Sequence, residues 1–187
     1  MFDLVKKSIQ QFGSFSEKDL MEVVNRLRTM QLRKDAVLIP EGHVCREFYF
    51  VNKGCFRQYT ITDEGTEATL NLYVEEDWMF DYKSFISQRP TDAVMQAAED
   101  SEVLRLDAHD FHDLVKISDG FFRIGVIFQQ AIQNQDYQNN RVTPEEKYSL
   151  LLARKPRIVQ KFPLKHVASY LGMTPETLSR IRRKIIS

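Results

Sequence analysis

The 187-residue sequence predicts an α+β fold, in which an antiparallel β-roll with flanking helices is followed by a long helix and a compact group of C-terminal helices. Three observations predict it. Apolar residues recur at helical spacing in the first thirty residues, alternate with polar residues from residue 31 to residue 107, and return to helical spacing afterwards. Turn residues separate the alternating runs at intervals of about ten, which is typical of antiparallel sheets.

The N-terminal part, residues 1–117, is expected to form the β-roll with its helices. FSEKDLMEVVNRLRTM predicts a helix with Ser16 as its N-cap and the apolar residues on one face. The runs EFYFVNKG, CFRQYTITDEG and TEATLNLYVEED follow, rich in β-branched and aromatic residues. In the last run Leu70, Leu72 and Val74 alternate with polar or aromatic neighbours, so the strand has two different faces.

A long helix is predicted within residues 118–140, from GFFRIGVIFQQAIQNQDYQNNR. Its first half is apolar around nearly the whole circumference, so it needs cover on more than one side. The same helix of a second copy would cover Phe121, Ile124, Phe128 and Ala131 and produce a homodimer. A helix covered wholly by its own chain is the alternative, but the Gln- and Asn-rich second half extends beyond a small roll and favours the dimer.

The formal net charge of zero hides an uneven distribution. Residues 141–187 carry 11 basic and 3 acidic side chains, a net charge of +8, whereas residues 1–140 carry 15 and 23, a net charge of −8. Such an asymmetry predicts a polyanionic partner for the C-terminal segment only.

Residues 141–187 open with strong helix-start signals: a threonine suited to the N-cap, a proline at the first helical position and two glutamates in the first turn. Further on, PLKHVASYLGMTPETLSRIRRKI contains two short helical patterns. Gly172 can take the left-handed conformation that ends the first, and Thr174 with Pro175 can begin the second. Two helices joined in this way predict a helix-turn-helix.

The second of these helices has two chemically different faces at about 100° per residue. Leu178, Ile181 and Ile185 share one sector, which is expected to face a core. The opposite sector has side-chain types that read base edges, since Arg bridges two guanine acceptors, Glu accepts from cytosine and Thr contacts the thymine methyl. The base-reading candidates are Glu176, Thr177 and Arg180. The candidates for contact with the DNA backbone are Lys165, His166, Thr174, Ser179, Arg183 and Lys184.

A solvated basic helix is the competing interpretation, because Glu176 in a first turn and Arg183 and Lys184 in a last turn also suit the helix dipole. The dipole explains neither the net charge of +8 nor the glycine turn between two short helices, so DNA reading is favoured. The alternative function is a ligand-binding β-roll that acts through protein partners without specific DNA binding.

No residue pattern indicates an enzyme or a metal site, because no paired carboxylates, Ser/His/Asp set or ligand cluster has usable spacing. Cys45 and Cys55 are expected to be packed, reduced thiols, since two cysteines are too few for a four-cysteine site. His109 and His112 have helical spacing but no third ligand nearby, which favours a solvated face. Neither a signal peptide nor a run of about 18 apolar residues occurs, so a cytoplasmic protein without membrane contact is expected.

Several segments together resemble the Crp/Fnr family of bacterial transcription regulators: IPEG at 39–42, FYFVNKG at 48–54, DEGTEATL at 63–70 and VASYLGMTPETLSRIRRK at 167–184. The resemblance covers nearly the whole chain. It implies a sensor β-roll like the cyclic nucleotide-binding jelly roll, a dimerisation helix, and a helix-turn-helix domain of winged-helix type that binds palindromic double-stranded DNA. RNA polymerase is then a candidate second partner. The chain ends almost at the second helix, so most of the C-terminal wing is expected to be missing.

The recognition helix of that family begins with a segment similar to RETVGR. PETLSR in this chain keeps Glu176, Thr177 and Arg180, and Pro175 replaces the first arginine. The resemblance therefore supports these three base-reading candidates and leaves the target sequence open.

Family members that bind cyclic AMP hold its phosphate with a short helix that starts like FGE(L/I) and with an Arg-Ser or Arg-Thr pair about ten residues later. An amide nest and a guanidinium bind the phosphate there, and a carboxylate binds the ribose. In this chain Phe80 stands at the glycine, Asp81 at the glutamate, and Thr91 and Asp92 at the arginine pair. Because Asp92 would repel a phosphate and Arg89 is two positions away, neither cyclic AMP nor any cofactor is expected.

Another small effector remains a candidate for the roll. The residues that would line its pocket are Trp78, Phe80, Asp81, Tyr82, Phe85, Arg89, Thr91 and Asp92. Ordinary core packing is the favoured interpretation of the aromatic members of this set.

Overall fold

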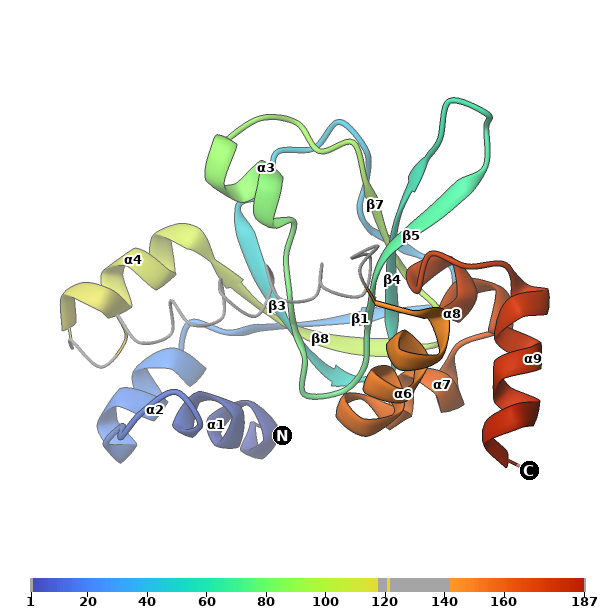
Figure 1. The fold of residues 1–187 in the computed structure, drawn as a ribbon. Coiled ribbons are helices and arrows are strands. Elements are labelled where there is room, and N and C mark those ends of the chain that lie inside the picture. Colours follow the sequence, from blue (N-terminus) through green and yellow to red (C-terminus); the bar gives the residue numbers. More distant parts are fainter. Residues whose placement is uncertain (1, 118–120, 122–141, 187) are drawn as a thin grey trace.

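The computed structural model describes residues 2–117, 121 and 142–186. Two four-stranded sheets form a roll in the middle of the molecule, with α1, α2 and α4 on one side and α6 to α9 on the other (Figure 1). The predicted β-roll with flanking helices is confirmed. The predicted long helix, at 118–140, lies outside the described residues except for Phe121.

Every described strand pair is antiparallel, as the alternating pattern predicts. One sheet has the order β1 (Arg28–Leu32), β8 (Ser101–Asp107), β3 (Glu47–Lys53) and β6 (Trp78–Met79). The other has the order β2 (Val37–Ile39), β7 (Val94–Ala97), β4 (Phe56–Ile61) and β5 (Glu67–Tyr73). Large apolar side chains between the sheets, such as Phe50, Phe56 and Leu104, are fully buried and form the core of the roll.

Helices close the ends of the roll. They are α1 (Asp3–Gln10), α2 (Glu17–Val24), α3 (Tyr82–Ser87) and α4 (Ala108–Ile117). Ser16 caps α2 as expected: its hydroxyl accepts from the Asp19 amide at 3.1 Å, and its own amide donates to the Asp19 carboxylate at 2.9 Å. This reciprocal pair satisfies two of the donors that a helix start leaves free.

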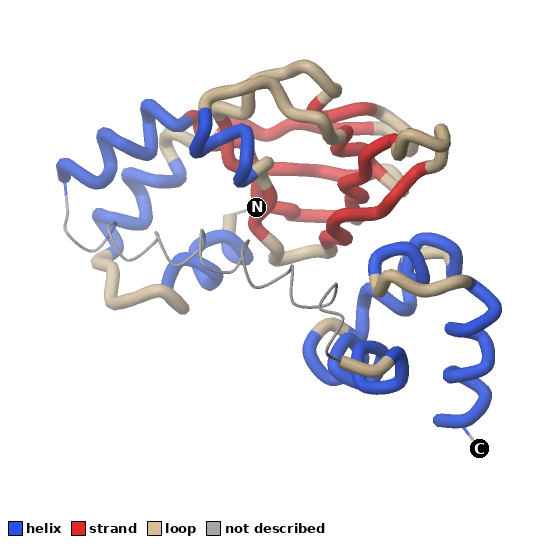
Figure 2. Tube along the Cα trace, turned by 45° about the horizontal axis from the view of Figure 1, so that its top comes forward, coloured by secondary structure: helices blue, strands red, loops and turns tan. Residues whose placement is uncertain are grey.

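The C-terminal helical unit, residues 142–186, consists of α6 (Pro144–Arg154), α7 (Pro156–Lys161), α8 (Leu164–Tyr170) and α9 (Pro175–Ile186). A capping box between Thr143 and Glu146 starts α6. Pro156 ends it, because the residue before a proline is driven out of the helical conformation, and Lys155 has φ −140°. Figure 2 shows these helices gathered at one end of the sheets.

This unit shares an apolar cluster with the β-roll. Tyr148, Leu151, Ile158 and the buried residues of α8 and α9 pack together with Cys55, Leu72 and Val74 of the roll. The boundary at residue 141 stays a prediction, but the two parts are in extensive contact.

Phe121 corrects one expectation about the dimer. Its side chain is fully buried in the core of its own β-roll, with its ring centroid 5.3 Å from that of Phe15. It is therefore covered within the chain and does not need a partner, whereas Ile124, Phe128 and Ala131 lie outside the described residues.

None of the helices among the described residues has both the length and the apolar character needed to cross a membrane.

Candidate nucleic-acid interface and ligand pocket

The connection between α8 and α9 has the geometry that the glycine predicts. Gly172 has φ +67°, its N–H donates to the Ser169 carbonyl at 3.0 Å, and the N–H of Met173 donates to the Ala168 carbonyl at 3.0 Å. These two bonds form a Schellman motif, which ends a helix by using its last free carbonyls. The next helix begins after Thr174, whose hydroxyl accepts from the Thr177 amide at 3.3 Å.

The two faces of α9 are separated as predicted, with one exception. Leu178 and Ile181 are buried, with 1% and 4% of their surface exposed. Glu176 and Arg180 are exposed on the outer side. Ile185 was expected in the buried sector but is 45% exposed, so the apolar stripe is covered only along the first part of the helix.

A groove of about 370 Å³ lies between the start of α6 and the outer side of α9. Its lining residues are Pro144, Glu145, Thr177, Arg180, Ile181 and Lys184. Two base-reading candidates, Thr177 and Arg180, thus lie on one wall of a concave surface, and their side chains are 3.5 Å apart from Nη2 to Oγ1.

A buried cation fastens α6 to the end of α8. Lys147 is 7% exposed, and its ammonium donates to the Leu171 carbonyl at 3.3 Å. A positive charge at a helix C-terminus meets the negative end of the helix dipole, so this contact stabilises the placement of α8. Lys147 of α6 consequently anchors the α8–α9 pair.

The candidates for backbone contact do not all lie on one surface. Lys165, Thr174, Arg183 and Lys184 are exposed, and Ser179 is half-buried. The pKa of His166 is lowered to about 4 by burial and then by the positive charges of Arg57 and Lys165. Since His166 is uncharged at neutral pH and lies near the roll, it is a poor partner for phosphate.

Strand β5 supports α8 directly. The N–H of Thr69 donates to the Ser169 hydroxyl at 2.9 Å, and Arg57 Nε donates to the Thr69 hydroxyl at 2.9 Å. The same guanidinium pairs with Glu67 at 2.5 Å, which lowers the pKa of that carboxyl. A polar network therefore links β4, β5 and α8.

A cavity of about 370 Å³ lies on the other side of β5, next to β4 and α3. Its lining residues are Gln58, Thr60, Leu70, Asn71, Tyr73, Phe80, Asp81, Tyr82, Lys83 and Asp92. Amides, hydroxyls, two carboxylates and the Lys83 ammonium line it together with a few apolar and aromatic side chains, so it offers hydrogen-bond partners to a small polar molecule.

Asp81 is a buried polar group of this cavity whose hydrogen-bonding capacity is largely used within the protein. It is 6% exposed, and its carboxylate accepts three hydrogen bonds: from the Ser84 amide at 2.7 Å, the Thr91 hydroxyl at 2.7 Å and the Gln58 amide at 3.0 Å. The first of these is an N-cap, so the carboxylate occupies the position at the start of α3 where an anion would be favoured.

The site does not fit the phosphate of a cyclic nucleotide. The amide at the start of α3 and the nearest hydroxyl are already used by Asp81. The neighbouring cation, Lys83, pairs with Asp92 at 3.0 Å. A bound phosphate would meet two carboxylates at short range and no free guanidinium among the residues that line the cavity.

Half of the predicted pocket residues line the cavity, namely Phe80, Asp81, Tyr82 and Asp92. Thr91 lies behind them and is bonded to Asp81. Of the other three, Arg89 is exposed and does not line the cavity.

Trp78 and Phe85 belong to the core, which the sequence favoured for the aromatic residues. The Trp78 indole donates to the Ser8 hydroxyl at 3.1 Å and lies 5.2 Å from the Phe50 ring, between centroids. Phe85 packs against Phe48 at 4.7 Å.

The pocket wall formed by β4 and β5 was not predicted from the sequence. Gln58, Asn71 and Tyr73 are joined through the Gln58 carbonyl oxygen, which accepts from Asn71 at 2.8 Å and from Tyr73 at 3.2 Å. The available signal was a polar residue at inward positions of two strands, because buried polar side chains need partners inside the fold.

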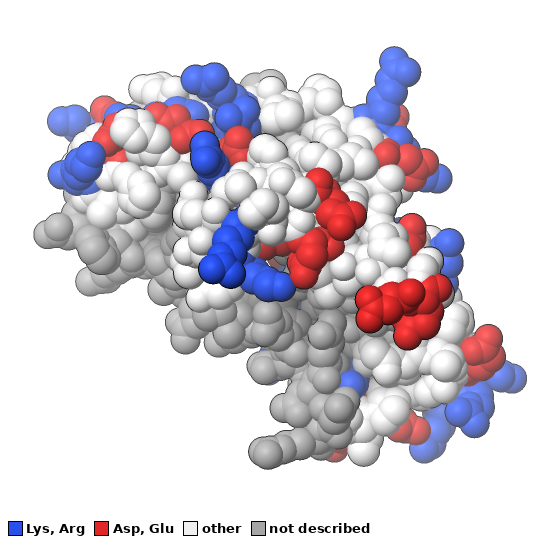
Figure 3. Space-filling view, turned by 90° about the horizontal axis from the view of Figure 1, so that it is seen from above, with Lys and Arg blue, Asp and Glu red and all other residues white. Residues whose placement is uncertain are grey.

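Among the described residues, neither the cysteines nor the metal-ligating side chains form a reactive site. Both cysteines are free and buried as expected, and burial raises the pKa of Cys45 to about 11 and that of Cys55 to about 12. No group of three metal-ligating side chains occurs among the residues that the structure describes. On the face shown in Figure 3, basic and acidic side chains form several small groups of either sign.

Comparison with a family model identifies the β-roll. Residues 29–118 match the cyclic nucleotide-binding domain. A potassium channel of Arabidopsis thaliana, SKOR, is 26% identical over 119 residues. That match spans 64% of this chain but only 14% of the channel, so it concerns one domain of a much longer protein.

Solved structures resemble a larger part of the chain. The catabolite activator protein of Thermus thermophilus aligns over 96% of this chain and 86% of its own, at 16% identity and a TM-score of 0.60. FixK2 of Bradyrhizobium japonicum aligns over 85% and 84%, at 19% identity and a TM-score of 0.71. The sensor domain of the transcriptional regulator DNR from Pseudomonas aeruginosa aligns over 74% and 91%, at 18% identity and a TM-score of 0.59. At these identities the likeness is one of fold.

Proposed function

We propose that the protein is a sequence-specific DNA-binding transcription regulator of the Crp/Fnr type, acting as a homodimer on a palindromic operator. In this proposal α8 and α9 form a helix-turn-helix, and α9 enters the major groove. Two such helices in a dimer would read half-sites about 34 Å apart, one turn of DNA.

The exposed face of α9 is the observation that carries the proposal. It presents Glu176 and Arg180 above a buried apolar side, and Lys184 follows one turn later. Arg180 is assigned to base readout because a guanidinium can bridge two acceptors of guanine, with Glu176 and Thr177 assisting. The likeness in fold to a catabolite activator protein, over most of the chain, supports a regulator of this fold but does not bear on the individual residues.

We also infer that the β-roll senses something other than a cyclic nucleotide, or is a scaffold without a ligand. The carboxylate of Asp81 at the start of α3, with its three donors, supports this inference. A neutral or cationic polar molecule fits the remaining surface better than an anion, since Asp92 and Asp81 both lie at the cavity.

The test compares three variants on DNA. An operator is first selected from a random DNA pool with the wild-type protein. Arg180→Ala is expected to cost about 1–3 kcal/mol on this operator and to relax one base position, because it removes a base contact. Lys184→Ala is expected to weaken selected and random duplexes about equally, because it removes a phosphate contact. Lys18→Ala serves as the matched control for loss of a charge, because Lys18 is an exposed residue of α2, far from α9 in sequence.

Equal losses on both duplexes for Arg180→Ala and Lys184→Ala would contradict the assigned roles. A wild-type protein without salt-sensitive affinity for any duplex would contradict DNA binding itself. That result would favour the alternative, a ligand-binding β-roll that acts through protein partners.

A further inference from the structure

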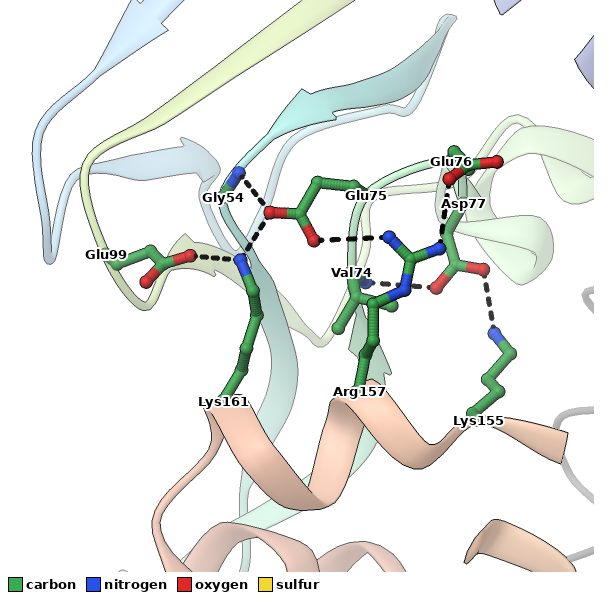
Figure 4. Close-up of polar contacts among 9 residues, drawn as sticks. All are labelled: Gly54, Val74, Glu75, Glu76, Asp77, Glu99, Lys155, Arg157 and Lys161. Carbon is green, nitrogen blue, oxygen red and sulfur yellow. Dashed lines mark hydrogen bonds and ion pairs between the residues drawn. The ribbon is translucent and has the colours of Figure 1, made fainter. Parts of the chain in front are cut away.

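A basic face of α7 lies against an acidic turn of the β-roll (Figure 4). The acidic turn consists of residues 75–77, between β5 and β6, and Glu99 lies beside it. The ion pairs and their N···O distances are Lys155–Asp77 (2.9 Å), Arg157–Glu76 (3.1 Å), Arg157–Glu75 (3.7 Å), Lys161–Glu99 (2.6 Å) and Lys161–Glu75. Three of the basic residues that make the C-terminal segment positive are thus turned toward the roll.

The carboxylates of the acidic turn are held in place by the roll itself. Glu75 accepts from the Gly54 amide at 3.1 Å, and Asp77 accepts from the Val74 amide at 3.0 Å. Because these bonds do not involve α7, the carboxylates are positioned for it in advance, which lowers the entropy cost of docking.

Glu76, at the centre of the acidic turn, has an unusual backbone conformation. Its φ of +73° lies in the left-handed region, which is costly for a residue with a side chain and would suit glycine. Its carboxylate, in turn, accepts from Arg157. The strained position therefore carries a side chain that is used at the interface.

Partial burial strengthens the contact. The side chains of Glu75 and Lys161 are 19% and 26% exposed. Burial is the largest single influence, and it raises the pKa of Glu75 and lowers that of Lys161. The hydrogen bonds and opposite charges around the two groups together outweigh it, so the pKa of Glu75 falls and that of Lys161 rises. Both shifts favour the charged forms. Partly buried pairs are screened less by salt than exposed ones.

The interface leaves the reading side of α9 open. Arg180 and Lys184 stay exposed while α7 is docked. Next to the ion pairs, Ile158 is fully buried in the apolar cluster that includes Leu72 and Val74 of the roll. The contact therefore fixes the orientation of the C-terminal helical unit without covering its outer surface.

We propose that the basic face of α7 is a docking surface for the β-roll and not for DNA, and that it holds the two C-terminal helical units of a dimer at a fixed spacing. This proposal rests on the DNA-binding function proposed above. Two units on flexible tethers would tolerate changes in the distance between half-sites, because effective concentration varies slowly with tether length. Two docked units accept only half-sites one helical turn apart.

The experiment measures preference for spacing in the full-length protein. Affinity is compared between the selected operator and the same operator with five base pairs inserted between its half-sites. The wild type is expected to prefer the parent operator by about 100-fold, and Lys161→Glu is expected to reduce this preference below about 10-fold. Lys161 pairs with both Glu75 and Glu99, so the reversed variant combines Lys161→Glu with Glu75→Lys and Glu99→Lys, and it is expected to restore the preference. Lys184→Glu, the matched control, lowers affinity for both duplexes and keeps the preference.

Hydrogen exchange of residues 67–73 and 156–161 gives a readout that does not depend on DNA. Exchange is expected to rise in Lys161→Glu and to return in the reversed variant. Lys155→Glu with Asp77→Lys is a second swapped pair, for use if the first fails to fold, because the ion pair of Lys155 is with Asp77. Unchanged spacing preference and exchange in the single variants, or losses that neither swap restores, overturn the proposal. If the wild type binds no DNA, the proposed function fails, and the exchange pattern alone decides whether α7 docks through these charges.

Discussion

The exposed cations of α8 and α9 determine how steeply DNA binding should weaken with salt. Each cation that neutralises a phosphate releases condensed counterions and adds to the salt dependence of the binding constant. The exposed basic residues on these two helices that are assigned to the DNA backbone are Lys165, Arg183 and Lys184. The three basic residues at α7 pair with carboxylates of the roll and should not contribute.

Three cations in each protomer correspond to about six phosphate contacts for a dimer, and at about −0.9 per contact the slope of log K against log salt is about −5. Between about 50 and 200 mM salt, affinity for random duplex should then fall about 10³-fold. If the basic face of α7 also bound phosphate, about twelve contacts would give a slope of about −11.

Fluorescence anisotropy with a labelled random duplex, over a series of KCl concentrations, measures this slope. Lys184→Ala should make the slope shallower by about 2 for the dimer, whereas Lys161→Ala should leave it unchanged. A wild-type slope of about −11, or an equal change in the two variants, would refute the reasoning that α7 is turned away from DNA.

Three further predictions concern the roll and the helix α8 that packs against it. Gly54 has φ +92°, and a Cβ there would lie 2.1 Å from Ser101 Oγ and 2.8 Å from Ser101 Cα. Gly54→Ala should therefore lower the free energy of unfolding in urea by about 2–4 kcal/mol, against about 1 kcal/mol for Gly65→Ala. Equal losses in the two variants would exclude a clash at Gly54. A Cβ at Gly65, with φ +75°, would meet nothing within 4 Å. His166 has a folded pKa of about 4 against 6.5 ordinarily, so stability should be complete above pH 6.5 and decline as the pH falls, because the unfolded chain binds the proton first. Urea unfolding should show that His166→Gln removes the decline just below pH 6.5, where the lowered carboxyl pKa values do not yet act; an unchanged decline would assign it elsewhere. Cyclic AMP at about 1 mM should leave the melting temperature unchanged, whereas a ligand with a Kd of about 10 µM would raise it by more than about 5 °C.

Alternation and capping made most of the roll predictable, because both depend on residues close in sequence. Ser16 and Gly172 act as their residue types predict. Burial across β5 was less predictable. Leu70, Leu72 and Val74 were placed on one face of a strand. Leu72 and Val74 do share a face, which packs against the C-terminal helices, but Leu70 lines the pocket, and Tyr73 faces the core of the roll. A sequence pattern shows that a face is apolar without showing which partner covers it.

The charge asymmetry was read as a sign of a polyanionic partner, and the structure assigns part of it differently. Lys155, Arg157 and Lys161 meet carboxylates of the roll, so opposite charges of the two segments partly compensate each other within the chain. Net charge is a sum over residues and carries no information about which side chains face each other. The pairing depends on the position of α7 against the acidic turn, which Figure 4 shows.

Strand β5 is shared by the pocket and by the C-terminal helical unit, and an irregularity in its register makes this possible. Gln58 pairs with Asn71, but the next residue, Tyr59, pairs with Thr69, so Leu70 is an extra residue in the ladder. Because side chains alternate along a strand, the extra residue turns Leu70 to the pocket and Thr69 to Arg57 and α8. Without the bulge the two would exchange faces. α8 is hydrogen-bonded to β5 through Thr69, so a movement of β5 that alters the pocket also shifts the support of α8. The ion pairs of α7 lie just beyond the end of the same strand.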